Sequence, residues 1–272
     1  VLAGTQAVRE AGRAFSTAAT TAEGRARAMA ATRLVVGQTG RGSFTVSGGA
    51  VVDGTRQPEG LCLTGACGAL IGAGAGAHGV FSITGAGSRA SFLGTLQLAH
   101  PLVYTPANGG FVFGSPGGQA RGSLSIEDGA TVTSGTGALA TAPGGPAMLG
   151  TESAHATVLI DGPGSTWTLK PMTAGSPMPG LTTAAHASAV AEITIRNGGR
   201  LVLDGGAVGG TGPNAYTFLN LSRGGSTHVS VHGVGSAIDM SGRSTVLQVG
   251  RQGGVATLDV LAGATVTTQL MQ

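Results

Sequence analysis

The chain has 272 residues and a formal net charge of +3, with 51 glycines but only 10% charged and 4% aromatic residues. Abundant glycine without a three-residue period excludes collagen, and high hydrophobicity with low charge excludes a disordered chain. The absence of basic runs and the scarcity of aromatic residues argue against binding to nucleic acid. No apolar run is long enough to cross a membrane as a helix. The composition favours a folded all-β chain of short strands and tight turns.

The first 33 residues differ from the rest of the chain. The stretch "VREAGRAF" from Val8 to Phe15 is similar to "IRNGGRLV" from Ile195 to Val202. We therefore expect residues 1–33 to form a partial coil followed by a loop. We also expect the whole of 1–272 to be a single segment of a longer repeat array, because solenoids carry capping repeats at their ends.

From residue 34 to 266 one pattern recurs seven times: a strand ending in glycine, a turn, an alternating strand, a glycine-rich turn and a third strand. The first copy is "LVVGQTGRGSFTVSGGAVVD", and later copies begin at Ala69, Phe111, Ala147, Ala187, Phe218 and Val246. The last apolar residues of the middle strands are Val46, Ile83, Ile126, Ile160, Ile195, Val231 and Val260. They are separated by 37, 43, 34, 35, 36 and 29 residues. Internal repetition of this length indicates a solenoid.

The middle strand explains how such repeats bury a core. Side chains alternate between the two faces of a strand, so Phe44 and Val46 point one way while Thr45 points the other. Coils stacked about 4.8 Å apart would form continuous aliphatic ladders, with glycines at the corners. An antiparallel sandwich is the alternative, but the period of these strands is too regular for it. The sequence predicts a parallel β-helix of about seven to eight coils.

The repeats vary in length mainly after the third strand. The additional stretches are "TRQPEGLCLTGACG", "LGTLQLAHPLVYTPANGG", "TSGTGALATAPGGP" and "DGGAVGGTGPNAYT". We expect these loops to project from one corner. Insertions on one face of a solenoid often bind a partner, although solvated loops without a partner are equally compatible with the pattern. Cys62 and Cys67 lie in the first of these loops and could close a small disulfide, with two free thiols as the alternative.

Four consecutive repeats carry a basic or titratable residue three positions before the first inward residue of the middle strand. These residues are Arg41, His78, Arg121 and His155. Stacked as a stripe, they are ligand-binding candidates for anionic glycans, lipopolysaccharide or an acidic protein surface, more strongly at low pH. The alternative is a solvated corner with no ligand.

Glu127 and Asp161 directly follow the middle strand on adjacent repeats. A separation of about 5 Å would suit a retaining glycosidase, which makes them weak catalytic candidates. However, both begin glycine-containing turns, and Arg196 on the next repeat can pair with Asp161. The chain has only two tyrosines and one tryptophan as sugar platforms, so we predict that it is not an enzyme. It lacks HExxH, Walker and calcium-nonapeptide motifs, and we predict neither a metal nor a cofactor.

The pattern "VGxxGxGxFTVSGGAxV" and the variant "GPGSTW" from Gly162 to Trp167 resemble the passenger repeats of bacterial autotransporters. The resemblance covers residues 34–266 and implies a right-handed parallel β-helix. It also implies export to the bacterial cell surface or medium and a C-terminal outer-membrane β-barrel in the same precursor. The passenger itself is then not inserted in the membrane. The close spacing of Cys62 and Cys67 is also typical of this family.

Three functions remain open after this resemblance. The first is a non-enzymatic adhesin or interaction scaffold that binds a host protein, a glycan or copies of itself. The second is an immune-evasion passenger that captures a host serum protein through its loops. The third is a polysaccharide-active enzyme that uses Glu127 and Asp161.

Overall fold

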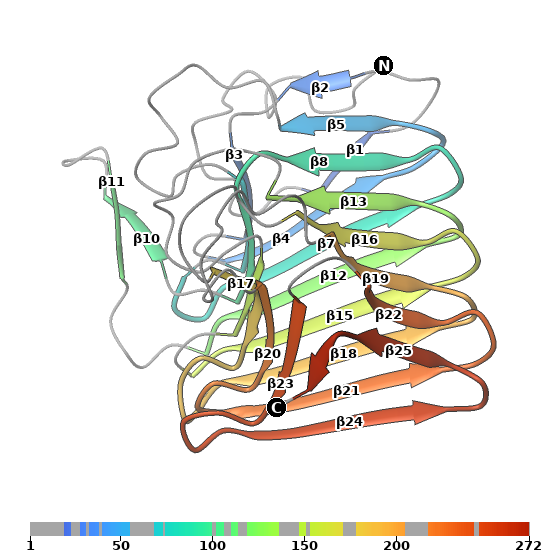
Figure 1. Ribbon diagram of the computed structural model, residues 1–272. Coiled ribbons are helices and arrows are strands. Elements are labelled where there is room, and N and C mark those ends of the chain that lie inside the picture. Colours follow the sequence, from blue (N-terminus) through green and yellow to red (C-terminus); the bar gives the residue numbers. More distant parts are fainter. Residues whose placement is uncertain are drawn as a thin grey trace, which may run out of the picture.

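The computed structural model contains three parallel sheets of eight strands each, which wind around one core (Figure 1). It describes residues 19–22, 28–30, 33–37, 40–54, 68–72, 74–99, 102–105, 110–113, 119–135, 147–150, 153–170, 178–204, 217–241 and 245–271. Within these ranges, no helix is long and apolar enough to span a membrane.

The longest strands form sheet A. They are β1 (Ala19–Ala22), β4 (Arg41–Val46), β7 (His78–Thr84), β12 (Arg121–Glu127), β15 (His155–Asp161), β18 (Val190–Arg196), β21 (Ser226–His232) and β24 (Val255–Leu261). Sheet C follows each of these strands across a tight turn. It comprises β2 (Ala28–Ala30), β5 (Val51–Gly54), β8 (Arg89–Phe92), β13 (Thr131–Ser134), β16 (Thr166–Leu169), β19 (Arg200–Leu203), β22 (Ala237–Met240) and β25 (Thr265–Thr268).

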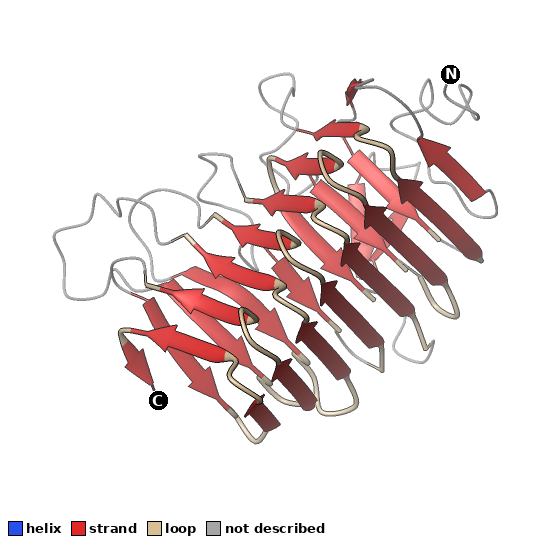
Figure 2. Ribbon diagram, turned by 90° about the vertical axis from the view of Figure 1, so that its right-hand side faces the viewer, coloured by secondary structure: helices blue, strands red, loops and turns tan. Residues whose placement is uncertain are grey.

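Sheet B closes each coil. Its strands are β3 (Arg33–Val36), β6 (Gly68–Ile71), β9 (Thr95–Leu98), β14 (Ala147–Leu149), β17 (Met178–Thr183), β20 (Thr217–Leu221), β23 (Thr245–Val249) and β26 (Leu270–Met271). The coils are numbered 1 to 8, from the coil of β1 to the coil of β24. Each coil stacks on the next along the sequence, and Figure 2 shows the resulting rows of strands. The predicted parallel β-helix is confirmed, and crossovers between parallel strands of one sheet are right-handed in about 98% of cases.

The predicted register of sheet A is confirmed along coils 2 to 8. The residues from Val46 to Val260 that align in the sequence are direct partners between neighbouring strands. All but Val260 are fully buried, whereas Val260 in coil 8 is 41% exposed. Phe44 and Phe81 stack with ring centroids 5.7 Å apart, so the ladder includes aromatic as well as aliphatic contacts.

The turns between sheets A and C alternate in length from coil to coil. Six positions separate Ile126 from Val132, whereas seven separate Ile160 from Trp167, and the two lengths alternate from coil 2 to coil 8. Each longer turn ends in a buried serine: Ser88, Ser165 and Ser236. The Oγ atoms of these serines accept hydrogen bonds from the backbone N–H groups of Gly49, Gly129 and Gly198 in the preceding shorter turns. Coils 2 and 3, 4 and 5, and 6 and 7 are therefore linked in pairs.

The sequence predictions for the first strands of two repeats were wrong. The copy assigned from Ala187 begins after its sheet B strand, β17. The other error concerns the first strand of the third copy. We assigned it to Phe111, but the sheet B strand of coil 3 is β9, where Leu96 and Leu98 are fully buried and pair with β6 and β14. The segment β11 (Gly110–Phe113) instead pairs antiparallel with β10 (Leu102–Thr105). This hairpin lies beside the β-helix in Figure 1. It belongs to an insertion between sheets B and A, whereas the other long insertions join sheets C and B as expected.

Three predictions fall on residues that the structure does not describe. The proposed partial coil at 8–15 lies outside the described ranges, in which coil 1 consists of β1, β2 and β3. Cys62 and Cys67 also lie outside them, as do the interiors of the long loops between sheets C and B. The disulfide and the loop-binding hypotheses remain predictions.

Candidate functional site

The outer face of sheet A is a regular grid of four columns of side chains that point away from the core. Column 1 holds the first residue of each strand and column 4 the last outward position, six residues later. Column 1 comprises Arg41, His78, Arg121, His155, Val190, Ser226 and Val255 in coils 2 to 8. Column 4 comprises Ser47, Thr84, Glu127, Asp161, Arg196, His232 and Leu261. Columns 2 and 3 lie between them and carry mostly serine and threonine.

The structure brings the four predicted stripe residues into column 1 on consecutive coils. Arg41 and Arg121 are exposed, and no ion pair joins either to another described residue. His155 is different, because its Nε2 lies 3.5 Å from Oε1 of Glu192 in column 2 of the next coil. The guanidinium groups of Arg41 and Arg121 are therefore the strongest anion-binding groups of this stripe.

The two candidate catalytic carboxylates, Glu127 and Asp161, are direct partners between β12 and β15. Arg196 holds Asp161 from the next coil, with Nε 2.8 Å and a terminal nitrogen 2.7 Å from Oδ2. The side-chain nitrogen of Asn197 donates to Oδ1 at 2.7 Å. Asp161 thus has both carboxylate oxygens occupied.

These contacts fix the charge of Asp161. Partial burial raises its pKa, but hydrogen bonds from Asn197 and Arg196 and the positive charge of Arg196 together lower the pKa below its ordinary value of 3.8. A glycosidase needs one carboxyl group with a raised pKa as its acid. Asp161 therefore does not suit the acid role, and the oxygens that a nucleophile would need are held by Arg196 and Asn197.

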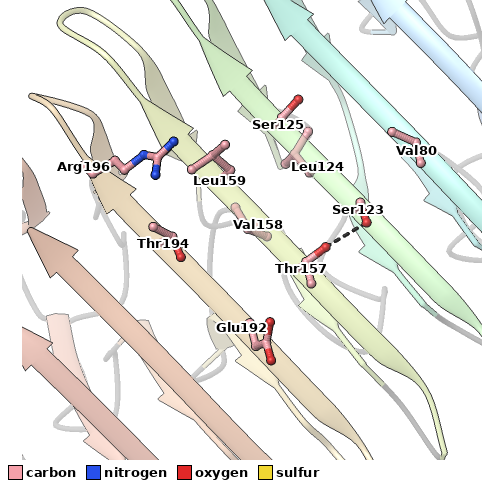
Figure 3. Close-up of a pocket in the computed structure, with 10 residues that line it drawn as sticks. All are labelled: Val80, Ser123, Leu124, Ser125, Thr157, Val158, Leu159, Glu192, Thr194 and Arg196. Atoms are coloured by element: carbon pink, nitrogen blue, oxygen red, sulfur yellow. Dashed lines mark hydrogen bonds between the residues drawn. The ribbon is translucent and has the colours of Figure 1, made fainter.

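A shallow depression of about 330 Å³ lies in the centre of the same face. Figure 3 shows Ser123 and Ser125 on β12, Leu159 on β15 and Glu192 and Arg196 at its borders. Its volume is at the lower limit for pockets that enclose small molecules, and it is open to solvent. Within the described ranges no group of three or more acidic, histidine or cysteine side chains could hold a metal ion. The depression is better suited to contact with a surface than to an enclosed ligand.

Sequence reasoning anticipated the pairing of Arg196 with Asp161 but missed other polar contacts of this face. It did not identify Asn197 as the second donor to Asp161. It also missed two diagonal pairs, His155 with Glu192 and His228 with Asp259 at 3.8 Å. Each of these pairs joins a column to the next column on the following coil. Such a contact can be found in the sequence once the column register is known.

Comparison with known proteins gives one weak structural similarity. The chain resembles the crystal structure of a TibC-catalyzed hyper-glycosylated TibA fragment, with 15% identity, a TM-score of 0.19 and coverage of 94% of this chain and 88% of that one. At this TM-score the similarity supports no argument about fold or function. No protein-family model and no curated protein matches the chain.

Proposed function

We propose that this chain is an adhesin-like interaction scaffold displayed on or secreted from a bacterial cell, and that it does not catalyse a reaction. The observation that supports this proposal is the alignment of Arg41, His78, Arg121 and His155 along one edge of sheet A. The resemblance of its repeats to autotransporter passengers supports the location at the cell surface.

The spacing of the stripe suits an extended anionic partner. Arg41 and Arg121 are two coils apart, which corresponds to about 10 Å along the helix axis. An anionic glycan or lipopolysaccharide lying along this axis can meet both guanidinium groups, with His78 between them. Because the arginines are exposed, binding will weaken as salt screens the charges.

The test is binding of the 272-residue chain to immobilised heparin, used as a polyanion probe, at low and moderate salt. Arg41→Ala/Arg121→Ala removes two exposed charges worth up to about 1 kcal/mol each, so we expect binding about tenfold weaker and a smaller salt dependence. Arg89→Ala is the matched control, because Arg89 is exposed on sheet C. Equal losses in both variants would show non-specific attraction, and unchanged binding in the double variant would remove the stripe from the proposal.

The other two hypotheses have weaker support. Capture of a serum protein by the loops between sheets C and B depends on residues outside the described ranges. Polysaccharide cleavage by Glu127 and Asp161 is disfavoured by the ion pair between Asp161 and Arg196.

A further inference from the structure

The charges on sheet A are divided between the two edges of one face. In coils 4 and 5, column 1 carries Arg121 and His155, whereas column 4 carries Glu127 and Asp161. Six residues of extended strand separate the columns, or about 20 Å. Between the two columns, Ser123 and Ser125 of coil 4 are small and uncharged. In coils 4 and 5 the face is therefore basic at one edge, acidic at the other and uncharged in its centre; farther along, Glu192 and Asp259 lie in the two central columns.

We infer that this face binds the same face of a second copy of the chain, with the two helix axes parallel. The inference rests on the proposed role as an adhesin-like scaffold and names a partner for it. The two copies are related by a two-fold axis that runs parallel to the helix axis, above the line between columns 2 and 3. Each coil of one copy then faces the same coil of the other copy. This rotation places column 1 of each copy against column 4 of the other.

This arrangement pairs opposite charges twice at coil 4, and at coil 5 it sets His155 against an Asp161 that Arg196 and Asn197 already hold. Arg121 of one copy faces Glu127 of its partner copy, and His155 faces Asp161. At the other end of the face, Val255 and Leu261 in coil 8 are 67% and 53% exposed and lie in columns 1 and 4. They therefore also face each other. The same two-fold rotation therefore matches the charged residues of one copy with those of the other, and the apolar residues of coil 8 with each other.

No like-charged residues face each other along the four columns of coils 2 to 8. In column 4, Arg196 faces Val190 of the partner copy, and His232 faces Ser226. In the centre, Ser123 faces Ser125, and Glu192 faces Thr194. The small hydroxyl side chains allow the two faces to approach each other closely.

The alternative face-to-face pairing has its two-fold axis along the strands and makes the helices antiparallel. It places column 1 on column 1 and column 4 on column 4. At full overlap of coils 2 to 8, Arg121 faces the uncharged Val190 and Glu127 faces Arg196, but Asp161 faces Asp161 of the partner copy. Juxtaposed like charges oppose association and suppress incorrect pairings. The parallel pair has no contact between like charges, and this favours it over the antiparallel pair.

The area is sufficient for a specific but reversible dimer. A face about 20 Å wide and about 29 Å long over coils 2 to 8 buries roughly 600 Å² per copy, or about 1,200 Å² in total. This value is at the lower end of the range for specific interfaces. Parallel copies point the same way, so the pair forms between neighbours on one surface and not between opposing surfaces.

Charge reversal tests the pairing directly. Arg121→Glu alone sets the new carboxylate against Glu127 of the partner copy, and Glu127→Arg alone sets the new guanidinium against Arg121. We expect each single variant to dimerise at least about tenfold more weakly than the wild type in sedimentation velocity. In an equimolar mixture of the two variants, a heterodimer avoids these like-charge contacts, so we expect the mixture to dimerise more strongly than either variant alone. The chain that carries both substitutions restores opposite charges in a homodimer and should dimerise like the wild type. Arg89→Glu on sheet C is the matched control and is expected to dimerise normally.

The outcomes separate this inference from the proposed function. A wild-type chain that stays monomeric at high micromolar concentration, or single variants that dimerise normally, would overturn the pairing. Failure of the doubly reversed chain to associate, with circular dichroism showing it folded, would overturn the parallel arrangement. Arg41 faces the uncharged Ser47 in the pair, so Arg41→Ala should weaken heparin binding and leave dimerisation intact. Heparin binding that does not depend on Arg41, alongside normal dimerisation, would contradict the proposed polyanion contact only.

Discussion

Ser165 in the turn of coil 5 is bonded to Gly129 in the turn of coil 4, 36 residues earlier in the chain. Its Oγ accepts the Gly129 N–H at 3.0 Å, and its hydroxyl donates to the carbonyl of Asp161. Ser88 and Ser236 make the equivalent bonds to the shorter turns before them. Two successive coils with different turns therefore form the structural repeat of this helix, and the buried serine joins them.

Ser165→Ala removes this connection. The Gly129 N–H loses its partner in a partly buried turn, and we expect a loss of about 1–3 kcal/mol in the free energy of unfolding. Urea denaturation followed by circular dichroism measures the effect. Ser125→Ala is the control, because Ser125 lies on the outer face of sheet A. Equal stability of the two variants would show that the serine does not link the coils.

The single tryptophan is held by one buried hydrogen bond. Trp167 is fully buried, and its Nε1 donates to Oγ of Ser134 on the preceding coil at 3.2 Å. Ser134→Ala leaves the indole N–H without this partner, and we expect a loss of about 1–3 kcal/mol. Tryptophan fluorescence follows the unfolding, with Thr133→Ala on the outward side of the same strand as control. Identical unfolding midpoints for the two variants would exclude a stabilising role for the bond.

Two glycines with the same φ but different surroundings distinguish the cost of backbone strain from the cost of steric crowding. Gly72 and Gly76 both have φ of +71°. A Cβ on Gly72 would lie 2.0 Å from the carbonyl oxygen of Arg121, whereas one on Gly76 would meet nothing within 4 Å. Gly76→Ala should cost about 1 kcal/mol from the left-handed backbone alone, and Gly72→Ala several kcal/mol. Comparable losses in thermal denaturation would show that coil packing at Gly72 adapts.

The sequence predicted the part of the fold that alternation and repetition determine. Inward residues such as Val46 and Ile83 recur with both a strand period and a coil period, so the register of sheet A followed directly. The sheet B strand of coil 3 was missed for a specific physical reason. Its neighbours β6 and β14 are followed by the left-handed glycines Gly72 and Gly150, but β9 is followed by Ala99, with φ of +52°. A search for strands ending in glycine therefore selected "FVFG" in the inserted hairpin.

The candidate site was predictable to a similar degree. Column membership, including the stripe from Arg41 to His155, follows from the register and was correctly anticipated. The diagonal contact between His155 and Glu192 was not, because it depends on side-chain reach between different columns of neighbouring coils. The self-complementary charge pattern was missed as well, since columns 1 and 4 were considered separately.

Stability in acid should depend on Asp161. Its pKa is lower in the folded protein than the ordinary value of 3.8, so the ionised carboxylate stabilises the fold above that value. The stabilisation is lost as the pH falls through the lower, folded-state pKa. Asp161→Asn should therefore be less stable than the wild type near pH 7, by under about 1 kcal/mol because Arg196 is half exposed, and the difference should shrink below pH 4. Denaturation midpoints across this pH range measure it.

Arg196→Ala provides the matched control for this pH dependence. It removes one of the two donors that hold the Asp161 carboxylate, so Asp161→Asn should have a smaller, less pH-dependent effect in that background. A pH dependence that is unchanged by Arg196→Ala would assign the low pKa to Asn197 alone. A difference between wild type and Asp161→Asn that grows on acidification would contradict the direction of the shift.

Dimerisation and polyanion binding use the same edge of sheet A, so they should compete. In the parallel pair, Arg121 and His155 are covered by Glu127 and Asp161 of the partner copy, and a polyanion reaches them only when the faces separate. Heparin oligosaccharides added to the wild-type dimer should therefore shift it to monomer in sedimentation velocity, with a larger effect at low salt. Arg41→Ala should lower the affinity for heparin without lowering the affinity of the two copies for each other, so more heparin should be needed to dissociate the dimer of this variant. A dimer that binds heparin and stays intact would show that the two contacts lie on different surfaces.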